Sequence, residues 1–200
     1  MLTERSFHHM NIFVWNVQVA GSREVLNSLR EHIHMHRPSI VALVETLISG
    51  AKAQSVCDRI EFRNCFRVEA QGFQGGIWVL WNSEEIEIEV INSHERFVMV
   101  EIKPHGQMSW LLTFVYASPQ IQTREILWRQ LQQLATEYLK PWLLTGDFNE
   151  TTSLEERNHG GPEILRRCNR FKHWIDNNGL INLGYSGLKF TWMRGLSQAT

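Results

Sequence analysis

Residues 142–149 read Trp-Leu-Leu-Thr-Gly-Asp-Phe-Asn, an apolar run that ends in an acid and an amide two positions apart. Alternate side chains of an extended chain point to the same face, so we expect Asp147 and Asn149 to project into one space. A carboxylate beside a carboxamide suits a hard cation or a phosphate, which need oxygen ligands and hydrogen-bond donors. A Gly-Asp turn after a buried strand is also ordinary loop chemistry, and this stretch alone leaves both interpretations open.

Other apolar runs of the chain also end in a single polar residue. Three of them resemble strand tips: residues 12–15 lead to Asn16, residues 40–44 lead to Glu45, and residues 111–115 lead to Tyr116. Sites in open α/β sheets form at the carboxyl ends of the strands. The pattern therefore predicts that these polar residues gather at one edge.

This ordered set of tips resembles the endonuclease/exonuclease/phosphatase superfamily, and the resemblance covers about residues 10 to 195. The tips concerned are Trp15-Asn16, Glu45-Thr46, Tyr116 and Gly146-Asp147-Phe148-Asn149. A finer resemblance, to plant non-LTR (LINE-type) retrotransposon endonuclease domains, rests on residues 75–81, 157–161, 179–187 and Phe190-Thr191-Trp192. The fold implied by the resemblance is a DNase I-like, four-layer α/β sandwich of two mixed sheets flanked by helices.

The resemblance also implies a function, which is hydrolysis of DNA phosphodiester bonds with the help of a divalent cation. Glu45 suits Mg²⁺, or Mn²⁺ in its place, because Mg²⁺ typically keeps several waters and takes only one or two protein carboxylates. Asn16 would hold the same metal or order Glu45. By the same resemblance Asp147 orients or deprotonates the attacking water, Asn149 binds a phosphate oxygen and Tyr116 stabilises the phosphate.

The end of the chain departs from the family pattern. Related chains continue past residues 190–192 into an Arg-Leu-Asp strand and a Ser-Asp-His strand, whereas this sequence stops at Thr200. On that ground we expect a truncated domain that lacks the last strands and exposes a sheet edge for a partner chain to cover. Two alternatives follow: a catalytically inactive remnant that keeps the fold and, with weaker support, a phosphatase of the same superfamily.

Periodicity predicts the helices. Apolar residues recur at helical spacing over residues 23–36, behind Ser22 as a candidate N-cap. A second helix is expected over residues 123–139, with these residues facing the core: Ile126, Leu127, Leu131 and Leu134. A third is expected over residues 162–178, with Gly179 as its C-terminal stop.

The remaining pattern indicates one domain. Apolar runs and turn signals between residues 76 and 116 are typical of successive antiparallel strands. Strands with flanking helices and 43% apolar residues fit a single core, which we assign to residues 10–195. Residues 1–9 are then an N-terminal extension and residues 196–200 a tail.

Charge and location give weaker signals. The net charge of −1 gives the whole chain no attraction for DNA. A basic rim for nucleic acid is instead predicted just after the Asp147 strand, from Arg157, Arg166, Arg167 and Arg170, although a solvated helix face explains the same residues. The three cysteines lack Cys-x-x-Cys spacing and are expected to be free. Neither a signal peptide nor a membrane-length apolar run is present, which predicts a nuclear or cytoplasmic protein that is not secreted.

Overall fold

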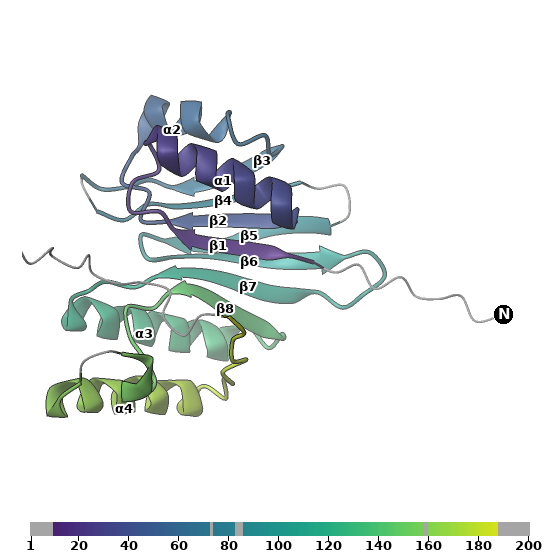
Figure 1. Ribbon diagram of the computed structural model, residues 1–200. Coiled ribbons are helices and arrows are strands. Elements are labelled where there is room, and N and C mark those ends of the chain that lie inside the picture. Colours follow the sequence, from purple (N-terminus) through teal and green to yellow (C-terminus); the bar gives the residue numbers. More distant parts are fainter. Residues whose placement is uncertain (1–9, 73, 83–85, 158–159, 188–200) are drawn as a thin grey trace, which may run out of the picture.

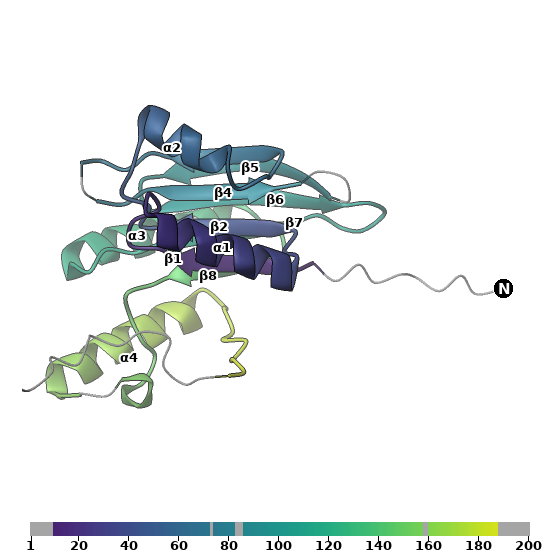
Figure 2. The same cartoon turned by 45° about the horizontal axis from the view of Figure 1, so that its top comes forward.

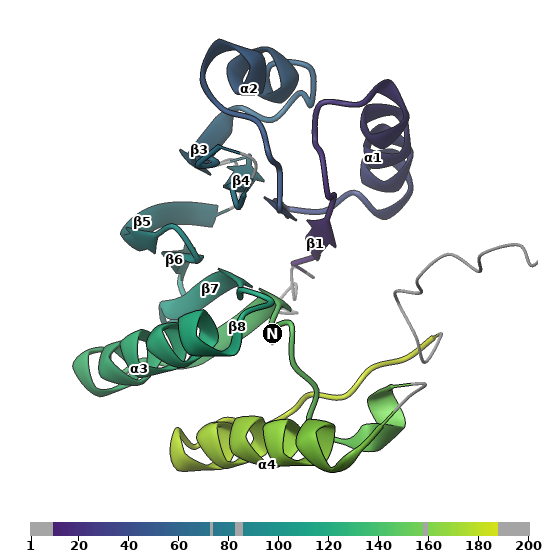
Figure 3. The ribbon, with the colours of Figure 1, turned by 90° about the vertical axis from the view of Figure 1, so that its left-hand side faces the viewer.

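Two four-stranded sheets stack face to face in the part of the chain that the structure describes (Figures 1 and 3). The computed structural model describes residues 10–72, 74–82, 86–157 and 160–187. Several sequence predictions lie outside these residues, namely the extension at 1–9, the tail at 196–200, the motif Phe190-Thr191-Trp192 and residues 158 and 159 of the segment 157–161.

Both sheets are mixed. The first has the order β1-β2-β4-β3, with bounds Ile12–Asn16, Ile40–Val44, Ile77–Trp81 and Asn64–Val68. The second has the order β5-β6-β7-β8, with bounds Ile86–His94, Phe97–Pro104, Trp110–Tyr116 and Trp142–Asp147. The pairs β1/β2 and β7/β8 are parallel, and the other pairs are antiparallel. Each sheet therefore ends in a parallel edge pair, and β1 and β8 contact each other across the sandwich.

Helices cover both outer faces. Helices α1 (Arg23–His36) and α2 (Gly50–Cys57) lie on the first sheet, and α3 (Ile121–Glu137) lies on the second (Figures 2 and 3). Helix α4 (Pro162–Asn177) follows a short 3₁₀ turn, η1 (Leu154–Glu156), and packs outside α3. This is the four-layer α/β sandwich that the sequence predicted. In the described residues, none of the helices combines the length and apolarity needed to cross a membrane.

The alternation of side chains along a strand builds the core. On β2, Ile40, Ala42 and Val44 point into the space between the sheets, while Val41 and Leu43 pack under α1 and α2. Both faces are buried, which explains why the strand reads as a continuous apolar run. A third apolar layer joins the second sheet to α3, whose Leu127, Leu131 and Leu134 are buried.

The helix predictions hold with small corrections. Helix α1 has the predicted bounds, and the Ser22 Oγ accepts a hydrogen bond from the Val25 amide at 3.1 Å. Helix α4 begins at Pro162 and is followed by Gly179 at φ +62°, as expected. Helix α3 begins and ends two residues before the predicted bounds. The assignment of Ile126 to the core was wrong, because it is 50% exposed and lies about 100° around the helix from the buried stripe.

Two elements were missed. Helix α2 has only eight residues, too few for a clear period, and β3 is a short edge strand with a polar residue at every second or third position. These elements bring Cys57 and Cys65 together, with 3.3 Å between their sulfurs. Both thiols and that of Cys168 are free, as the sequence predicted.

Gly146 provides a test of the close packing between β7 and β8. It has φ +134°, and an added Cβ would lie 2.1 Å from the Val115 carbonyl oxygen. We expect Gly146→Ala to lower the free energy of unfolding by about 2–4 kcal/mol, measured by urea denaturation. Gly106→Ala is the matched control, because Gly106 also has a positive φ, of +70°, but no atom lies within 4 Å of an added Cβ. Equal losses in both variants would show that the contact with Val115 contributes nothing.

Candidate active site

The tips of the two parallel edge pairs meet at one end of the sandwich. Asn16 ends β1 and Asp147 ends β8, and the Asn16 Nδ2 donates a hydrogen bond of 2.8 Å to the Asp147 Oδ2. Glu45 follows β2, and Tyr116 ends β7 opposite Asp147. The structure thus brings together four of the predicted site residues, two from each sheet.

Tyr116 links the second sheet to Glu45. Tyr116 is 5% exposed, and the nearby Glu45 carboxylate acts on its phenol. The Arg96 guanidinium lies 5.6 Å from the centre of its ring. Burial and the neighbouring Glu45 carboxylate raise the pKa of the Tyr116 phenol well above its usual value, and Arg96 opposes the rise. The phenol therefore keeps its proton at neutral pH and acts as a donor.

Asn149 lies in the loop after β8 rather than in the strand. Its backbone is left-handed, with φ +48°, and its amide donates a hydrogen bond of 2.8 Å to the Asp147 Oδ1. Its Nδ2 donates at 2.8 Å to the carbonyl of Ala117, which follows β7. Phe148 turns the other way and packs against Trp128 and Phe171 of the outer helices. Asn149 therefore ties together the two loops that follow β7 and β8.

Asn16 is also engaged on the β8 side of the site. While its Nδ2 contacts Asp147, its Oδ1 accepts a hydrogen bond of 3.2 Å from the Gln18 amide. The sequence analysis expected Asn16 either to hold the metal or to order Glu45. The contacts of its side chain orient Asp147 instead of Glu45. An amide oxygen has two lone pairs, so the Asn16 Oδ1 keeps one beside its bond to Gln18.

Sequence reasoning missed Arg96 in this region, and it named Thr46 only as part of the Glu45-Thr46 tip, without a role. Arg96 lies in the turn between β5 and β6, where nothing in the local sequence distinguishes it from an ordinary charged turn residue. Thr46 is fully buried, and its hydroxyl has no hydrogen-bond partner among the residues described. Gly76 leaves room for it, since an added Cβ there would lie 2.2 Å from the Thr46 Oγ1. The surroundings of both residues become visible only through contacts between distant segments.

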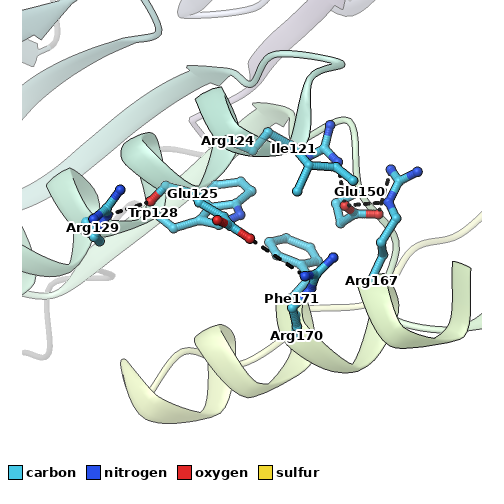
Figure 4. A pocket seen from close by; sticks show the side chains of 9 residues that line it. All are labelled: Ile121, Arg124, Glu125, Trp128, Arg129, Glu150, Arg167, Arg170 and Phe171. Carbon is cyan, nitrogen blue, oxygen red and sulfur yellow. Dashed lines mark hydrogen bonds and ion pairs between the residues drawn. The ribbon is translucent and has the colours of Figure 1, made fainter. Parts of the chain in front are cut away.

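The predicted basic rim divides into two parts. Arg157 and Arg167 contact Glu150, with the nearest pair at 3.1 Å between the Arg167 Nη2 and the Glu150 Oε1. Arg166 and Arg170 form longer ion pairs with Glu163 and Glu125, and their side chains are 76% and 55% exposed. A pocket of about 400 Å³ lies between α3 and α4, and Figure 4 shows Arg167 and Arg170 in its lining. Arg157 and Arg167 are thus next to the loop of Asn149, Arg170 is at the pocket, and Arg166 faces solvent.

The donors at the strand tips fit a hard cation. Glu45 and Asp147 offer carboxylates, Asn16 a carboxamide oxygen and Tyr116 a phenol oxygen, and oxygen is what Mg²⁺ and Mn²⁺ prefer. Within the described ranges no group of three or more His, Cys, Asp or Glu side chains is placed to hold a metal ion. One or two carboxylates suffice for Mg²⁺, which keeps several of its waters.

Comparisons with known proteins point to one family. A family model described as the endonuclease/exonuclease/phosphatase family matches residues 13–194. No curated protein matches the chain. Among solved structures, the endonuclease domain of TRAS1, a telomere-specific non-LTR retrotransposon, is 15% identical with a TM-score of 0.66, covering 89% of this chain and 74% of that chain.

Two further structures are similar. The AP endonuclease LMAP from Leishmania major is 14% identical with a TM-score of 0.65, covering 84% of this chain and 66% of its own. The 3′-5′ exonuclease NExo from Neisseria meningitidis is 18% identical with a TM-score of 0.58, covering 84% of this chain and 70% of its own. At these identities the likeness establishes a common fold.

The Tyr116–Glu45 contact predicts a specific titration. Because the pKa of Tyr116 is higher in the folded chain than in the unfolded one, the phenol contributes stability below its ordinary pKa of about 10, and this contribution is lost as pH rises through the folded value. Glu45→Gln should lower the pKa of Tyr116 but leave it raised, since burial, its largest cause, remains. Carbon-13 NMR of labelled tyrosine rings would measure it, with Tyr116→Phe to assign the signal. An unchanged pKa in Glu45→Gln would contradict the contact.

Proposed function

This chain belongs to the endonuclease/exonuclease/phosphatase family, and we propose that it hydrolyses phosphodiester bonds of DNA with a divalent cation at the strand tips. The observation that carries the proposal is the hydrogen bond between Asn16 and Asp147, which joins the edge strands of the two sheets where Glu45 and Tyr116 also lie. The likeness to the TRAS1 endonuclease domain supports DNA as the substrate and a retrotransposon origin.

Each need of the reaction has a candidate group. Glu45, with the Asn16 carboxamide oxygen, would hold Mg²⁺ or Mn²⁺. When bound, this cation supplies positive charge that draws electrons from the phosphate and eases attack by water. Asp147 orients the water or takes its proton, and it is fixed for this role because the Asn16 side chain and the Asn149 amide each hold one of its oxygens.

Two other groups act on the phosphate. Tyr116 keeps its proton well above neutral pH, and its hydroxyl is therefore a donor to negative charge that develops on a phosphate oxygen. The Asn149 Nδ2 donates one of its two protons to Ala117 and has a second proton for a phosphate oxygen. We assign contacts with the phosphate backbone of the DNA to four arginines: Arg157, Arg166, Arg167 and Arg170.

A phosphatase is a second candidate. One similar structure is that of a 3′ phosphatase NExo from Neisseria bound to a product DNA hairpin, so this fold also accommodates removal of a terminal phosphate from DNA. The same side chains would serve that reaction, because both reactions break a P–O bond after attack by water. The substrates of the two reactions distinguish them.

Nicking of supercoiled plasmid tests the proposal. We expect wild-type protein to nick with Mg²⁺ or Mn²⁺ and not with EDTA. Glu45→Gln and Asp147→Asn should each lower the rate by about 10²–10⁴, because each removes a charge on which the chemistry depends. Glu31→Gln, an exposed carboxylate of α1, is the matched control and should nick as the wild type does.

Other outcomes have distinct meanings. Folded wild-type protein that leaves plasmid intact, yet releases inorganic phosphate from a 3′-phosphorylated oligonucleotide, would favour the phosphatase. Silence in both assays would favour the inactive remnant. Equal nicking by the wild type and both site variants would place the reaction outside this site or in a contaminant.

The exposed arginines give a separate prediction about binding. Arg166 is 76% exposed and its ion pair with Glu163 is 3.6 Å long, so its charge is available to a DNA phosphate. Arg166→Gln should weaken duplex binding and reduce the slope of log K against log salt by about 1, measured by fluorescence anisotropy. Arg23→Gln, at the start of α1 on the opposite outer layer, should change neither. Identical slopes for both variants would remove Arg166 from the DNA contact.

A further inference from the structure

Arg124 is a buried cation on the face of α3 that looks toward the site. Its side chain is 2% exposed, and its guanidinium reaches three acceptors on two separate loops. The Nη1 donates to the carbonyls of Ser118 and Pro119, both at 2.7 Å. The Nη2 donates to the Glu150 Oε2 at 2.9 Å. One side chain thus bridges the loop that follows Tyr116 and the loop that follows Asp147.

These bonds continue the pairing of β7 and β8 beyond the end of the sheet. The Ala117 amide donates to the Asp147 carbonyl at 2.8 Å, and the Asn149 Nδ2 donates back to the Ala117 carbonyl. At the next residues, 118, 119 and 150, no backbone bond between the two loops is found in the described structure, and Arg124 takes over the connection. The guanidinium therefore connects the two loops where backbone hydrogen bonds between them end.

Glu150 is the other half of this connection. Its side chain is 5% exposed and contacts Arg157 and Arg167 as well as Arg124. Figure 4 shows Arg124, Glu150 and Arg167 close together at one end of the pocket between α3 and α4. Burial, followed by repulsion from Arg167 and Arg157, lowers the pKa of Arg124, while Glu150 opposes this. Removing Glu150 would leave the buried Arg124 without its carboxylate, and removing Arg124 would leave Glu150 with Arg157 and Arg167 but without the link to the loop that follows Tyr116.

We propose that Arg124 and Glu150 are positioning residues that clamp together the loops that follow Tyr116 and Asp147, and so fix Asn149 relative to these two strand ends. The inference rests on the proposed function, because positioning matters only if these side chains act together on a phosphate. Asn149 has a left-handed φ of +48°, a conformation that asparagine tolerates better than most residues. The Arg124–Glu150 pair, at the next residue along the chain, anchors the loop that contains it.

Kinetics of Arg124 variants test the proposal. Arg124→Gln should lower kcat for nicking by about 10²-fold and leave KM within about 2-fold, because displaced groups lose transition-state contacts more than ground-state binding. The kcat of Arg124→Lys should lie between that of the wild type and that of Arg124→Gln, since an ammonium keeps the charge but cannot span three acceptors. Arg129→Gln is the matched control: Arg129 lies on the exposed side of the same helix, bonds to the Glu125 carbonyl, and should nick as the wild type does.

Amide hydrogen exchange gives a readout that does not need activity. In Arg124→Gln and in Glu150→Gln, exchange at the Ala117 and Asn149 amides should accelerate by about 10-fold or more, because the Ala117 amide bonds to Asp147 across the two segments and the Asn149 amide bonds to Asp147 within the segment that Glu150 anchors. Arg129→Gln should leave both amides protected. Should Arg124→Gln fail to fold, Arg124→Lys and Glu150→Gln carry the test.

The results separate the inference from the proposed function. Wild-type protein without activity would end the proposed function, while faster exchange in the variants would still support the clamp. Unchanged exchange at both amides would overturn the clamp. So would a raised KM with a salt slope reduced by about 1, because that pattern identifies Arg124 as a direct phosphate contact.

Discussion

The hydrogen bond from Asn16 to Asp147 is the contact on which the candidate site depends. Between the two sheets lies an apolar layer, which sets their separation but gives little control over where the strand tips lie. The polar bond at 2.8 Å fixes one edge strand against the other at the place where the acids emerge. Gly146 makes this possible, since any larger residue would push β8 away from Val115 and carry Asp147 with it.

The outer helices help to aim the same loop. Phe148 lies between Asp147 and Asn149, and its ring packs with Trp128 of α3 and Phe171 of α4. Burying this ring on the helix side leaves its two polar neighbours on the side of the strand tips. The aromatic cluster and the Arg124–Glu150 pair line the same pocket between α3 and α4 and hold neighbouring residues of one short segment. Phe148 is held by packing, and Asn149 and Glu150 are held by neutral and charged hydrogen bonds.

The sequence predicted what local patterns encode. An apolar run that ends in a polar residue located Asn16, Glu45, Tyr116 and Asp147, because strand burial and strand ends are written in consecutive residues. Arg96 and Arg124 could not be found in this way, since each acts on a segment far away in the sequence. Arg124 and Glu150, for example, are 26 positions apart and belong to different elements. Ile126 was misplaced for a related reason: several apolar residues on one helix turn leave the inward face undetermined until packing decides it.

The placement of charge is compatible with the proposed DNA site on a chain of net charge −1. Three guanidiniums surround the single carboxylate of Glu150, so this cluster carries excess positive charge beside the loop of Asn149. The compensating acids lie elsewhere, for example Glu87 and Glu89 on β5 at the far edge of the second sheet. Field strength near a phosphate depends on the nearest charges, because salt screens those beyond about 8 Å. Local segregation of charge can therefore serve a polyanion where the overall balance cannot.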